Sequence, residues 1–243
     1  RVQDPYSFRC IPQVHGPVQE SFQKLIETVS IELNSSTDNP LIFPTPENPG
    51  PHEVVSQGNF HAEVLALVAD AMSLGLFELS SISERRIDQM LDPDRRALRP
   101  FLAENPGLES GLMIVQYVAA ASLGELRGHA NPRTAFSTTT SAGQEDHVSM
   151  GATASWNLLE AIQRCREVLA CEAFVAHRAI QLIERPSSTC VESLIRCMNN
   201  VVQPGFKDRN TSEEIQTIAA EFTSSSWLSV IQSMVETPLR KSL

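Results

Sequence analysis

Long segments with helical spacing of apolar residues constrain this chain more than any other feature. From Val14 to Leu33 the apolar residues recur at steps of three and four, which places them on one face of a helix. Similar patterns occupy about residues 59–90, 108–127 and 142–183. No stretch shows the sustained period-two alternation of a half-buried strand. The sequence therefore predicts an all-α fold, an elongated bundle of long antiparallel helices.

The remaining segments fit one all-α domain that covers residues 1–243. Three shorter helices are expected near the C-terminal end, at about residues 188–202, 213–222 and 225–236. The proline-rich residues 40–51 are expected to form a surface loop. The segment 108–127 is apolar almost all round, and such a helix is usually buried on every side. We therefore expect a second chain to cover it, within a larger helical oligomer.

Composition and charge exclude several classes of function. The chain has 19 Lys and Arg against 29 Asp and Glu, a net charge of −10. Nucleic acids and anionic membranes bind basic surfaces, so neither is an expected partner. The longest charge-free apolar stretch, residues 110–124, is too short to span a bilayer. Five cysteines without a CxxC pair indicate a reduced, cytoplasmic protein. The histidines lack the spacing by which two ligands on one helix bind a metal, so a metal site is not expected.

Three polar segments are unlike the rest of the predicted bundle. The first, residues 3–10, spaces an amide, a phenol and a guanidinium three residues apart, at Gln3, Tyr6 and Arg9. A loop can present three such groups in one direction. A hydrogen-bonded N-terminal loop would also account for this composition, so the segment by itself leaves a structural and a functional interpretation open.

The second and third segments carry helix-start signals. Residues 56–63 contain Asn59, a good N-cap for the helix that follows. Residues 138–150 contain Ser141 and Gln144 at the spacing of a capping box, which predicts a helix from about residue 142. The two carboxylates after Gln144 would then lie in its first turn, where they favour the helix dipole. Helix capping would explain both segments without any catalytic role.

Taken together, the segments resemble the aromatic amino acid ammonia-lyase family, and most closely its histidine-specific members. The resemblance covers essentially the whole chain. Five motifs occur in the family's order, at residues 3–10 (QDPYSFRC), 34–40 (NSSTDNP), 58–61 (GNFH), 83–87 (SERRI) and 144–150 (QEDHVSM). The resemblance implies an enzyme that eliminates ammonia from an aromatic amino acid, with L-histidine as substrate and urocanate as product.

The resemblance also implies a cofactor that this sequence does not encode. The family makes an electrophilic methylidene-imidazolone (MIO) group from an Ala-Ser-Gly tripeptide, and no Ala-Ser-Gly occurs here. In the family that tripeptide precedes the segment where this chain begins. The chain is therefore expected to be the C-terminal half of such an enzyme, with the N-terminal half as its partner. Family members form tetramers whose active sites draw on three subunits, so a homotetramer is expected.

Roles for individual residues follow from the same resemblance. Tyr6 and Glu145 would be catalytic, with Tyr6 exchanging a proton beside the MIO and Glu145 facing the ring or the departing amine. Arg9 would bind the substrate carboxylate, for which a guanidinium is well suited. Gln3 would form a hydrogen bond nearby, and Phe60 would pack against the substrate ring.

The remaining candidates concern which amino acid is the substrate. Phenylalanine-specific members have Gln at the position of Glu145 and Lys at that of Met113, whereas histidine-specific members have Glu and Met. A carboxylate accepts a hydrogen bond from an imidazole N–H, and a phenyl ring offers no donor. Tyr117, one turn after Met113, would line the same pocket and could favour another ring. Gln144 is a further candidate for substrate binding.

Three alternatives remain at this stage. The chain could be half of an MIO-dependent aromatic aminomutase, or half of a phenylalanine or tyrosine ammonia-lyase. It could also be a non-catalytic helical assembly module that has lost its electrophile. Upstream coding sequence separates the module from the enzymes, and analysis of the product separates the enzymes from one another.

Overall fold

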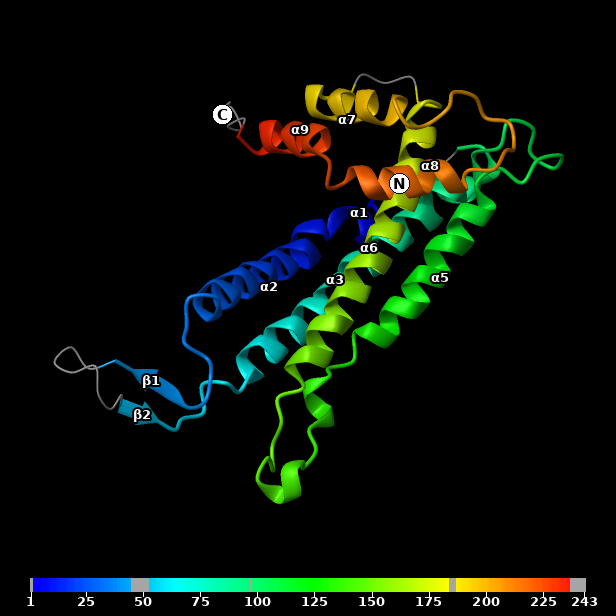
Figure 1. Cartoon of the computed structure of the whole chain (residues 1–243). Helices are drawn as coiled ribbons and strands as arrows, with labels where there is room; N and C mark the ends of the chain where they lie inside the picture. The colour runs from blue at the N-terminus through cyan, green and yellow to red at the C-terminus, as the bar shows by residue number, and fades with distance from the viewer. Residues whose placement is uncertain (1, 45–52, 97, 184–186, 237–243) are drawn as a thin grey trace. The chain divides into compact units, whose positions relative to one another are not determined.

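The computed structural model describes residues 2–44, 53–96, 98–183 and 187–236, and these are mostly helical (Figure 1). The long helices are α2 (Ile11–Glu32), α3 (Glu63–Leu91), α5 (Met113–His129) and α6 (Gly151–Ile180). The shorter helices are α1 (Tyr6–Arg9), α4 (Pro93–Arg96), α7 (Thr189–Asn199), α8 (Ser212–Glu221) and α9 (Ser225–Glu236). Three 3-10 turns, η1 (Pro100–Leu102), η2 (Thr134–Phe136) and η3 (Ser141–Gly143), connect them. The predicted all-α fold class is confirmed.

The chain divides into two compact units, which are described separately. The first unit contains residues 1–9, 80–125 and 163–243, and the second contains residues 10–79 and 126–162. Helices α3, α5 and α6 contribute residues to both. The single domain expected from the sequence stays a prediction.

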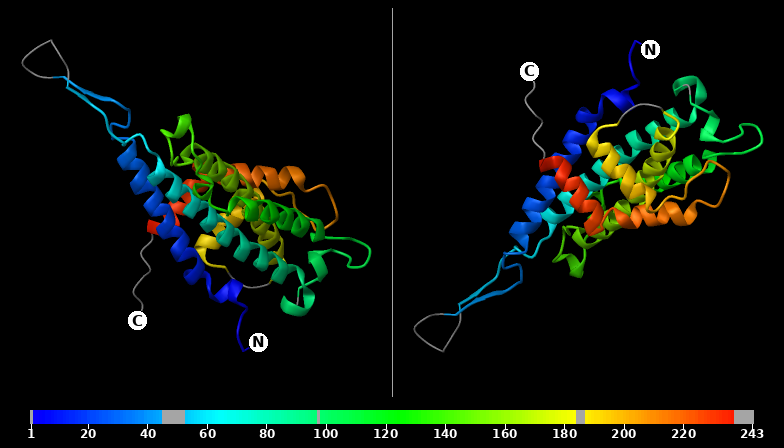
Figure 2. Two further views of the ribbon diagram at one scale, coloured as in Figure 1. Left: turned by 90° about the horizontal axis from the view of Figure 1, so that it is seen from below. Right: turned by 90° about the horizontal axis from the view of Figure 1, so that it is seen from above.

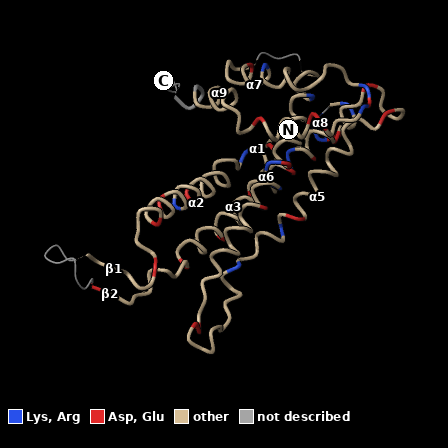
Figure 3. The backbone as a smooth tube through the Cα atoms, viewed as in Figure 1, with Lys and Arg blue, Asp and Glu red and all other residues tan. Residues whose placement is uncertain are grey.

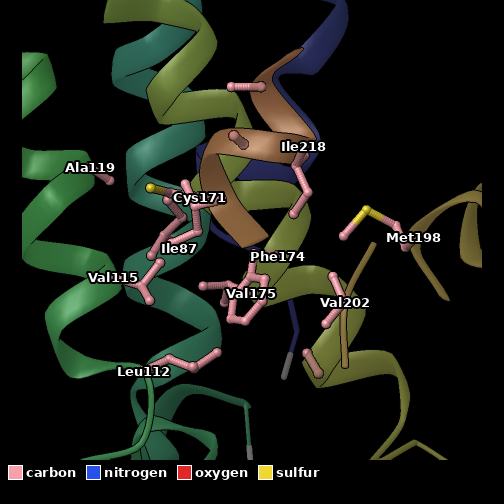
Figure 4. Close-up of a cluster of buried hydrophobic side chains, with 14 of the residues drawn as sticks. Ile87, Leu112, Val115, Ala119, Cys171, Phe174, Val175, Met198, Val202 and Ile218 are labelled. Atoms are coloured by element: carbon pink, nitrogen blue, oxygen red, sulfur yellow. The ribbon is translucent and has the colours of Figure 1, made fainter. Parts of the chain in front are cut away.

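The first unit is built around a cluster of buried apolar side chains (Figure 4). Phe174 of α6 and Ile87 of α3 have no exposed surface. Val115 of α5 and Ile218 of α8 join the same cluster. Because burying one such side chain contributes about 1.5–3 kcal/mol, this cluster is the main force that holds the four helices together.

The second unit has a smaller core, made largely of short side chains. Ala66, Ala69 and Met72 of α3 form a buried cluster with Leu158 of α6. Val18 of α2 packs against it, and α2 lies beside the first part of α3 in both views of Figure 2. Val18 and Leu25 of the predicted helical stripe therefore contact this core, whereas Phe22 and Leu33 of the same stripe are exposed.

Two short strands lie at the beginning of, and just after, the loop that was expected at residues 40–51. β1 (Leu41–Phe43) pairs antiparallel with β2 (Glu53–Val55), and Ile42 lies opposite Val54. Residues 45–52, between them, lie outside the described residues. Strands of three residues are too short for a period-two pattern to be recognised, so the sequence did not indicate them.

The sequence placed the start of α6 about nine residues too early. α6 begins at Gly151, and Thr140 and Glu145 instead form an isolated antiparallel bridge that closes a tight turn. Inside this turn Ala142 has a φ of 54° and Gly143 a φ of 90°, which no α-helix contains. The predicted capping box at the start of α6 is therefore wrong. The backbone N–H groups bond within the turn instead, with Thr140 N donating to Glu145 O at 2.9 Å.

α5 also begins later than predicted, at Met113 rather than near residue 108. The residues before it are held in a non-helical conformation. Leu112 N donates to the carbonyl oxygen of Phe101 at 2.8 Å. The carboxylate of Asp208 accepts from the backbone N–H groups of Ser110 and Gly111 at 2.8 and 2.9 Å. These contacts join residues that are far apart in the chain. A local helix pattern therefore cannot predict them.

α3 is long and apolar enough to cross a membrane by length and composition, with a mean hydropathy of 1.6 over 18 residues. Of that window, 44% is buried inside the structure. Its buried residues supply both cores, including Ile87 in the first unit and Ala66 in the second. Core helices of soluble proteins pass the same test, so this is weak evidence for a membrane span.

Candidate active site

The eight predicted site residues are distributed over both units, and seven of them are exposed. Gln3, Tyr6, Arg9, Met113 and Tyr117 belong to the first unit, and Phe60, Gln144 and Glu145 belong to the second. Only Met113 is half-buried. Reactive and apolar side chains that are accessible in one chain are available to a substrate or to another chain.

Tyr6 and Arg9 lie at the two ends of the short helix α1 and contact each other. The guanidinium carbon of Arg9 is 4.8 Å from the centroid of the Tyr6 ring, a cation–π contact. The Tyr6 side chain is 70% exposed. Among the described residues no carboxylate lies within ion-pair distance of Arg9. α1 therefore presents a phenol together with a positive charge that is free to bind an anion. Gln3 is exposed just before this helix.

Arg86 of α3 holds α1 in place within the first unit. Its Nη1 donates to the carbonyl oxygen of Ser7 at 3.5 Å, and its Nη2 donates to Glu172 Oε2 at 2.8 Å. Nη2 also donates to Ser83 Oγ at 2.9 Å. From the sequence, residues 83–87 were part of a family pattern, and Glu84, Arg85 and Arg86 were also interpreted as a solvated or inter-helix salt-bridge face. The structure shows that Arg86 is a positioning residue for the helix that carries Tyr6 and Arg9.

Arg96 of α4 makes a second attachment on the same segment. Its Nη1 donates to Asp4 Oδ1 at 2.9 Å, and its guanidinium stacks 3.8 Å from the centre of the Phe8 ring. Sequence reasoning did not predict the contacts of Arg86 with Ser7 and of Arg96 with Asp4, because these partners are 79 and 92 positions away. Only a contact across the fold reveals them.

Met113 and Tyr117 occupy successive turns of one side of α5. Tyr117 is 59% exposed, and its neighbours Ile114 and Val118 are exposed as well. The opposite side of α5 faces the core through Val115. Within this chain α5 is therefore buried on one side only, and its other side presents an apolar surface that includes both candidates.

The sequence predicted that Glu145 lies in the first turn of a helix. In the structure it lies instead in the tight turn before α6. Its Oε2 accepts a hydrogen bond from Thr140 Oγ1 at 2.5 Å. This bond, followed by one from the Ser141 hydroxyl, lowers the pKa of Glu145 below its usual value. The side chain is exposed and carries its charge at neutral pH, so it can only accept hydrogen bonds. Gln144, beside it, is also exposed.

Phe60 lies in the turn that precedes α3 and is 54% exposed. The predicted N-cap role of Asn59 is wrong, because α3 begins only at Glu63. Asn59 Nδ2 instead donates to the carbonyl oxygen of Ser36 at 2.7 Å. Gln57 N donates to Asn39 Oδ1 at 3.0 Å. The amide side chains of the second and third motifs thus fix the turn that displays Phe60.

The turn with Phe60 and the turn with Glu145 meet through two histidines in the second unit. The rings of His61 and His147 are stacked with their centroids 5.7 Å apart. His61 Nε2 is 3.1 Å from the carbonyl oxygen of His147. Sequence spacing could not show this, since the two residues are 86 positions apart. The structure thereby brings two of the predicted motifs together.

A cavity of about 900 Å³ also opens in the first unit, but none of the eight predicted residues lines it. Its charged lining comprises Arg164, Arg166, Arg178, Lys207 and Arg209 with Glu125, Glu167 and Asp208. Around α8 basic and acidic residues are interspersed (Figure 3). This cavity is therefore not the candidate active site.

Comparisons with known proteins point to one family. A family model described as aromatic amino acid lyase matches residues 1–200. The chain is 40% identical over 239 residues to histidine ammonia-lyase of Geobacillus sp. (strain WCH70), covering 98% of this chain and 46% of that protein. It is 43% identical over 221 residues to histidine ammonia-lyase of Bacillus mycoides (strain KBAB4), covering 90% and 43%.

Solved structures agree with the sequence relatives. Histidine ammonia-lyase from Trypanosoma cruzi superimposes with a TM-score of 0.87 at 36% identity, covering 95% of this chain and 45% of that chain. Phenylalanine aminomutase from Pantoea agglomerans gives a TM-score of 0.86 at 31% identity, covering 93% and 44%. The chain thus spans less than half the length of the curated relatives it matches.

Proposed function

Because the chain belongs to the aromatic amino acid lyase family, we propose that it is the C-terminal half of an ammonia-lyase that converts L-histidine to urocanate and ammonia. The observation that carries this proposal is the identity of 40–43% to histidine ammonia-lyases over at least 90% of the chain. Glu145 supports the choice of substrate. Its ionised carboxylate can accept the N–H of an imidazole, which a phenyl ring lacks.

Family membership implies the MIO electrophile, and we propose that the N-terminal half of the enzyme supplies it. No Ala-Ser-Gly occurs in this chain from which the group could form. The exposed Tyr6 hydroxyl and Gln3 amide fit such a group as hydrogen-bonding neighbours. When bound, the electrophile supplies covalent activation of the substrate amine for departure.

The residues of this chain then bind and orient the substrate. Arg9 binds the carboxylate in a charge-assisted pair, which fixes one end of the amino acid. Glu145 accepts a hydrogen bond from the ring at the other end. Tyr6 holds or moves a proton at its phenol oxygen. Phe60 and Met113 exclude water from the ring, and Tyr117 and Gln144 are further substrate-binding residues.

We further propose that the assembled enzyme is a cytoplasmic homotetramer. The exposed apolar side of α5, with Ile114 at 55% and Tyr117 at 59% exposure, supports burial by another subunit. The five free cysteines support a reducing compartment. The proposed site residues lie on accessible turns and helix ends, which suits a site completed by other subunits.

The test is activity by complementation. The purified chain is assayed for ammonia release from L-histidine alone and after refolding with an N-terminal half that contains Ala-Ser-Gly. The chain alone should be inactive, because general acid–base groups without an electrophile do not expel an amine well. The pair should produce urocanate. Ammonia release by the chain alone would contradict the proposal.

An aminomutase is the second candidate, favoured by the TM-score of 0.86 to a phenylalanine aminomutase. The same reconstituted pair separates the two activities when it is given L-histidine and L-phenylalanine. A β-amino acid product would support the mutase, and cinnamate from phenylalanine would support a lyase of the phenylalanine type. A pair that assembles without turning over any aromatic amino acid would support a non-catalytic module.

A further inference from the structure

Three residues of metal-ligating type meet in the second unit. His61 lies in the turn before α3, Glu63 is the first residue of α3, and His147 follows the turn that carries Glu145. One ligand atom from each, two ring nitrogens and a carboxylate oxygen, lie within 4.8 Å of one another. No metal site was predicted from the sequence, because His147 is far from the other two residues along the chain.

In one tautomer of each ring, a neighbouring hydrogen bond occupies one nitrogen and leaves the other free to bind a metal. His61 Nε2 is 3.1 Å from the carbonyl oxygen of His147. A carbonyl can only accept, so this nitrogen carries the hydrogen and Nδ1 keeps its lone pair. Histidines that bind metals commonly donate their other N–H to a carbonyl in this way.

His147 shows the same arrangement with its two nitrogens exchanged. Its Nδ1 is 3.2 Å from Ser137 Oγ, and in the tautomer that can bind a metal Nδ1 carries the hydrogen and donates it to this oxygen. Its Nε2 then carries a lone pair and faces Glu63 Oε2 at 3.9 Å. That separation is too long for a hydrogen bond. A nitrogen lone pair and a carboxylate therefore face each other across a gap.

We propose that His61, Glu63 and His147 bind a divalent transition-metal ion of the Zn²⁺ class. Ligands at about 2.0–2.2 Å from a tetrahedral zinc lie roughly 3.3–3.5 Å apart, so the three side chains must close by somewhat more than 1 Å. Their half-buried or exposed positions allow that movement. Two imidazoles and one carboxylate select Zn²⁺, Co²⁺ or Ni²⁺ over Mg²⁺ and Ca²⁺, which prefer oxygen ligands.

Such an ion would join the two turns that carry the proposed substrate contacts. His61 follows Phe60 directly, and His147 is two residues after Glu145. Binding would hold these turns together without the ion itself touching a substrate. The proposal does not depend on which amino acid the assembled enzyme uses.

The experiment measures zinc binding to the whole 243-residue chain after treatment with a chelator. Titration with ZnCl₂ against a competing zinc indicator should give one tight site per chain. His61→Gln and His147→Gln should each weaken binding by more than about tenfold, and Ser137→Ala by about tenfold through loss of its bond to the ring. Glu63→Gln, on the half-buried helix end, should also weaken binding. The matched controls are His15→Gln and Glu53→Gln, which should bind as the parent does.

X-ray absorption of the zinc-loaded parent chain identifies the ligands without any variant. It should show nitrogen and oxygen neighbours at about 2.0–2.1 Å with imidazole scattering. A sulfur shell near about 2.3 Å would place the ion at the free cysteines and overturn the proposal. The proposal would also be overturned if the parent chain did not bind zinc. The same holds if His147→Gln, shown by circular dichroism to be folded, bound zinc with unchanged affinity.

Discussion

Among the proposed site residues, Glu145 is the one on which the proposed choice of histidine as substrate depends most. The structure removes its helix-capping interpretation, because it lies in a turn before α6. In a reconstituted enzyme we expect Glu145→Gln to lower kcat/KM for histidine by about tenfold or more, because a charge-assisted hydrogen bond to the ring becomes a neutral one. The melting temperature should change little, since the side chain is exposed.

Asp146→Asn is the matched control, because it removes the same charge one residue further along the same loop. Its effect on histidine turnover should be smaller. If Glu145→Gln turns over histidine within about twofold of the parent, Glu145 does not contact the ring. The case for a histidine-specific site would then rest on Met113 and on the relatives.

His177 gives this protein a stability that depends on pH. Burial, with a smaller contribution from the charge of Arg178, lowers the pKa of His177 below its usual 6.5. The bond of its Nε2 to Asn199 Oδ1, at 2.8 Å, acts in the opposite direction and does not overcome burial. As pH falls below 6.5, the unfolded chain binds a proton that the folded chain does not, so the free energy of unfolding decreases.

Melting temperatures measured above and below pH 6.5 test this expectation. His177→Gln keeps a side chain that can bond to Asn199 but cannot titrate. Its melting temperature should fall less between the two conditions than that of the parent. Equal pH dependence in both proteins would show that other groups cause the loss of stability at acid pH.

At the scale of secondary-structure elements, the pair of Arg86 and Glu172 connects α3, α6 and α1. Only 10% of the Arg86 side chain and 18% of the Glu172 side chain are exposed. Arg86→Met leaves Glu172 without its partner and should lower the free energy of unfolding by about 3 kcal/mol. It also releases the carbonyl oxygen of Ser7, so α1 should become more mobile. Chemical denaturation and hydrogen exchange of residues 6–9 measure the two effects.

Two further variants separate this pair from an ordinary surface contact. Arg95→Met breaks the partly exposed pairs with Asp88 and Asp92 and should cost about 0–1 kcal/mol. In Arg86→Met combined with Glu172→Met neither charge is left unpaired, so much of the lost stability should return. If the double variant is no more stable than Arg86→Met alone, Arg86 stabilises the fold mainly through its hydrogen bonds to Ser7 and Ser83.

At the scale of the whole molecule, the exposed side of α5 predicts assembly. Ile114, Tyr117 and Val118 are each more than 40% exposed, on a helix whose opposite side is core. Covering this surface removes apolar area from water, which favours association. We expect the chain to be oligomeric in solution, and a tetramer when paired with the N-terminal half. Light scattering that shows a stable, folded monomer of 26.8 kDa would contradict this. Ile114→Asp should shift the population towards smaller species.

Local patterns in the sequence were enough for most of the secondary structure. The helix predicted at residues 225–236 has those bounds in α9, and the stripe from Val14 to Leu33 became α2. Helical periodicity depends only on residues three and four positions apart, so it can be recognised in the sequence alone. The motifs likewise identified the family and its candidate residues, because they are short and contiguous.

Contacts between distant residues were decided only by the tertiary structure. Ser141 and Gln144 have the local pattern of a helix start, but in the structure they lie in a turn that Thr140 and Glu145 close. The two histidines that stack in the second unit are 86 positions apart, as are Arg86 and Glu172 in the first. A sequence pattern shows which side chains lie on the same face of one helix or strand. Which distant groups meet there depends on how the elements pack, because burial and hydrogen bonding act through space.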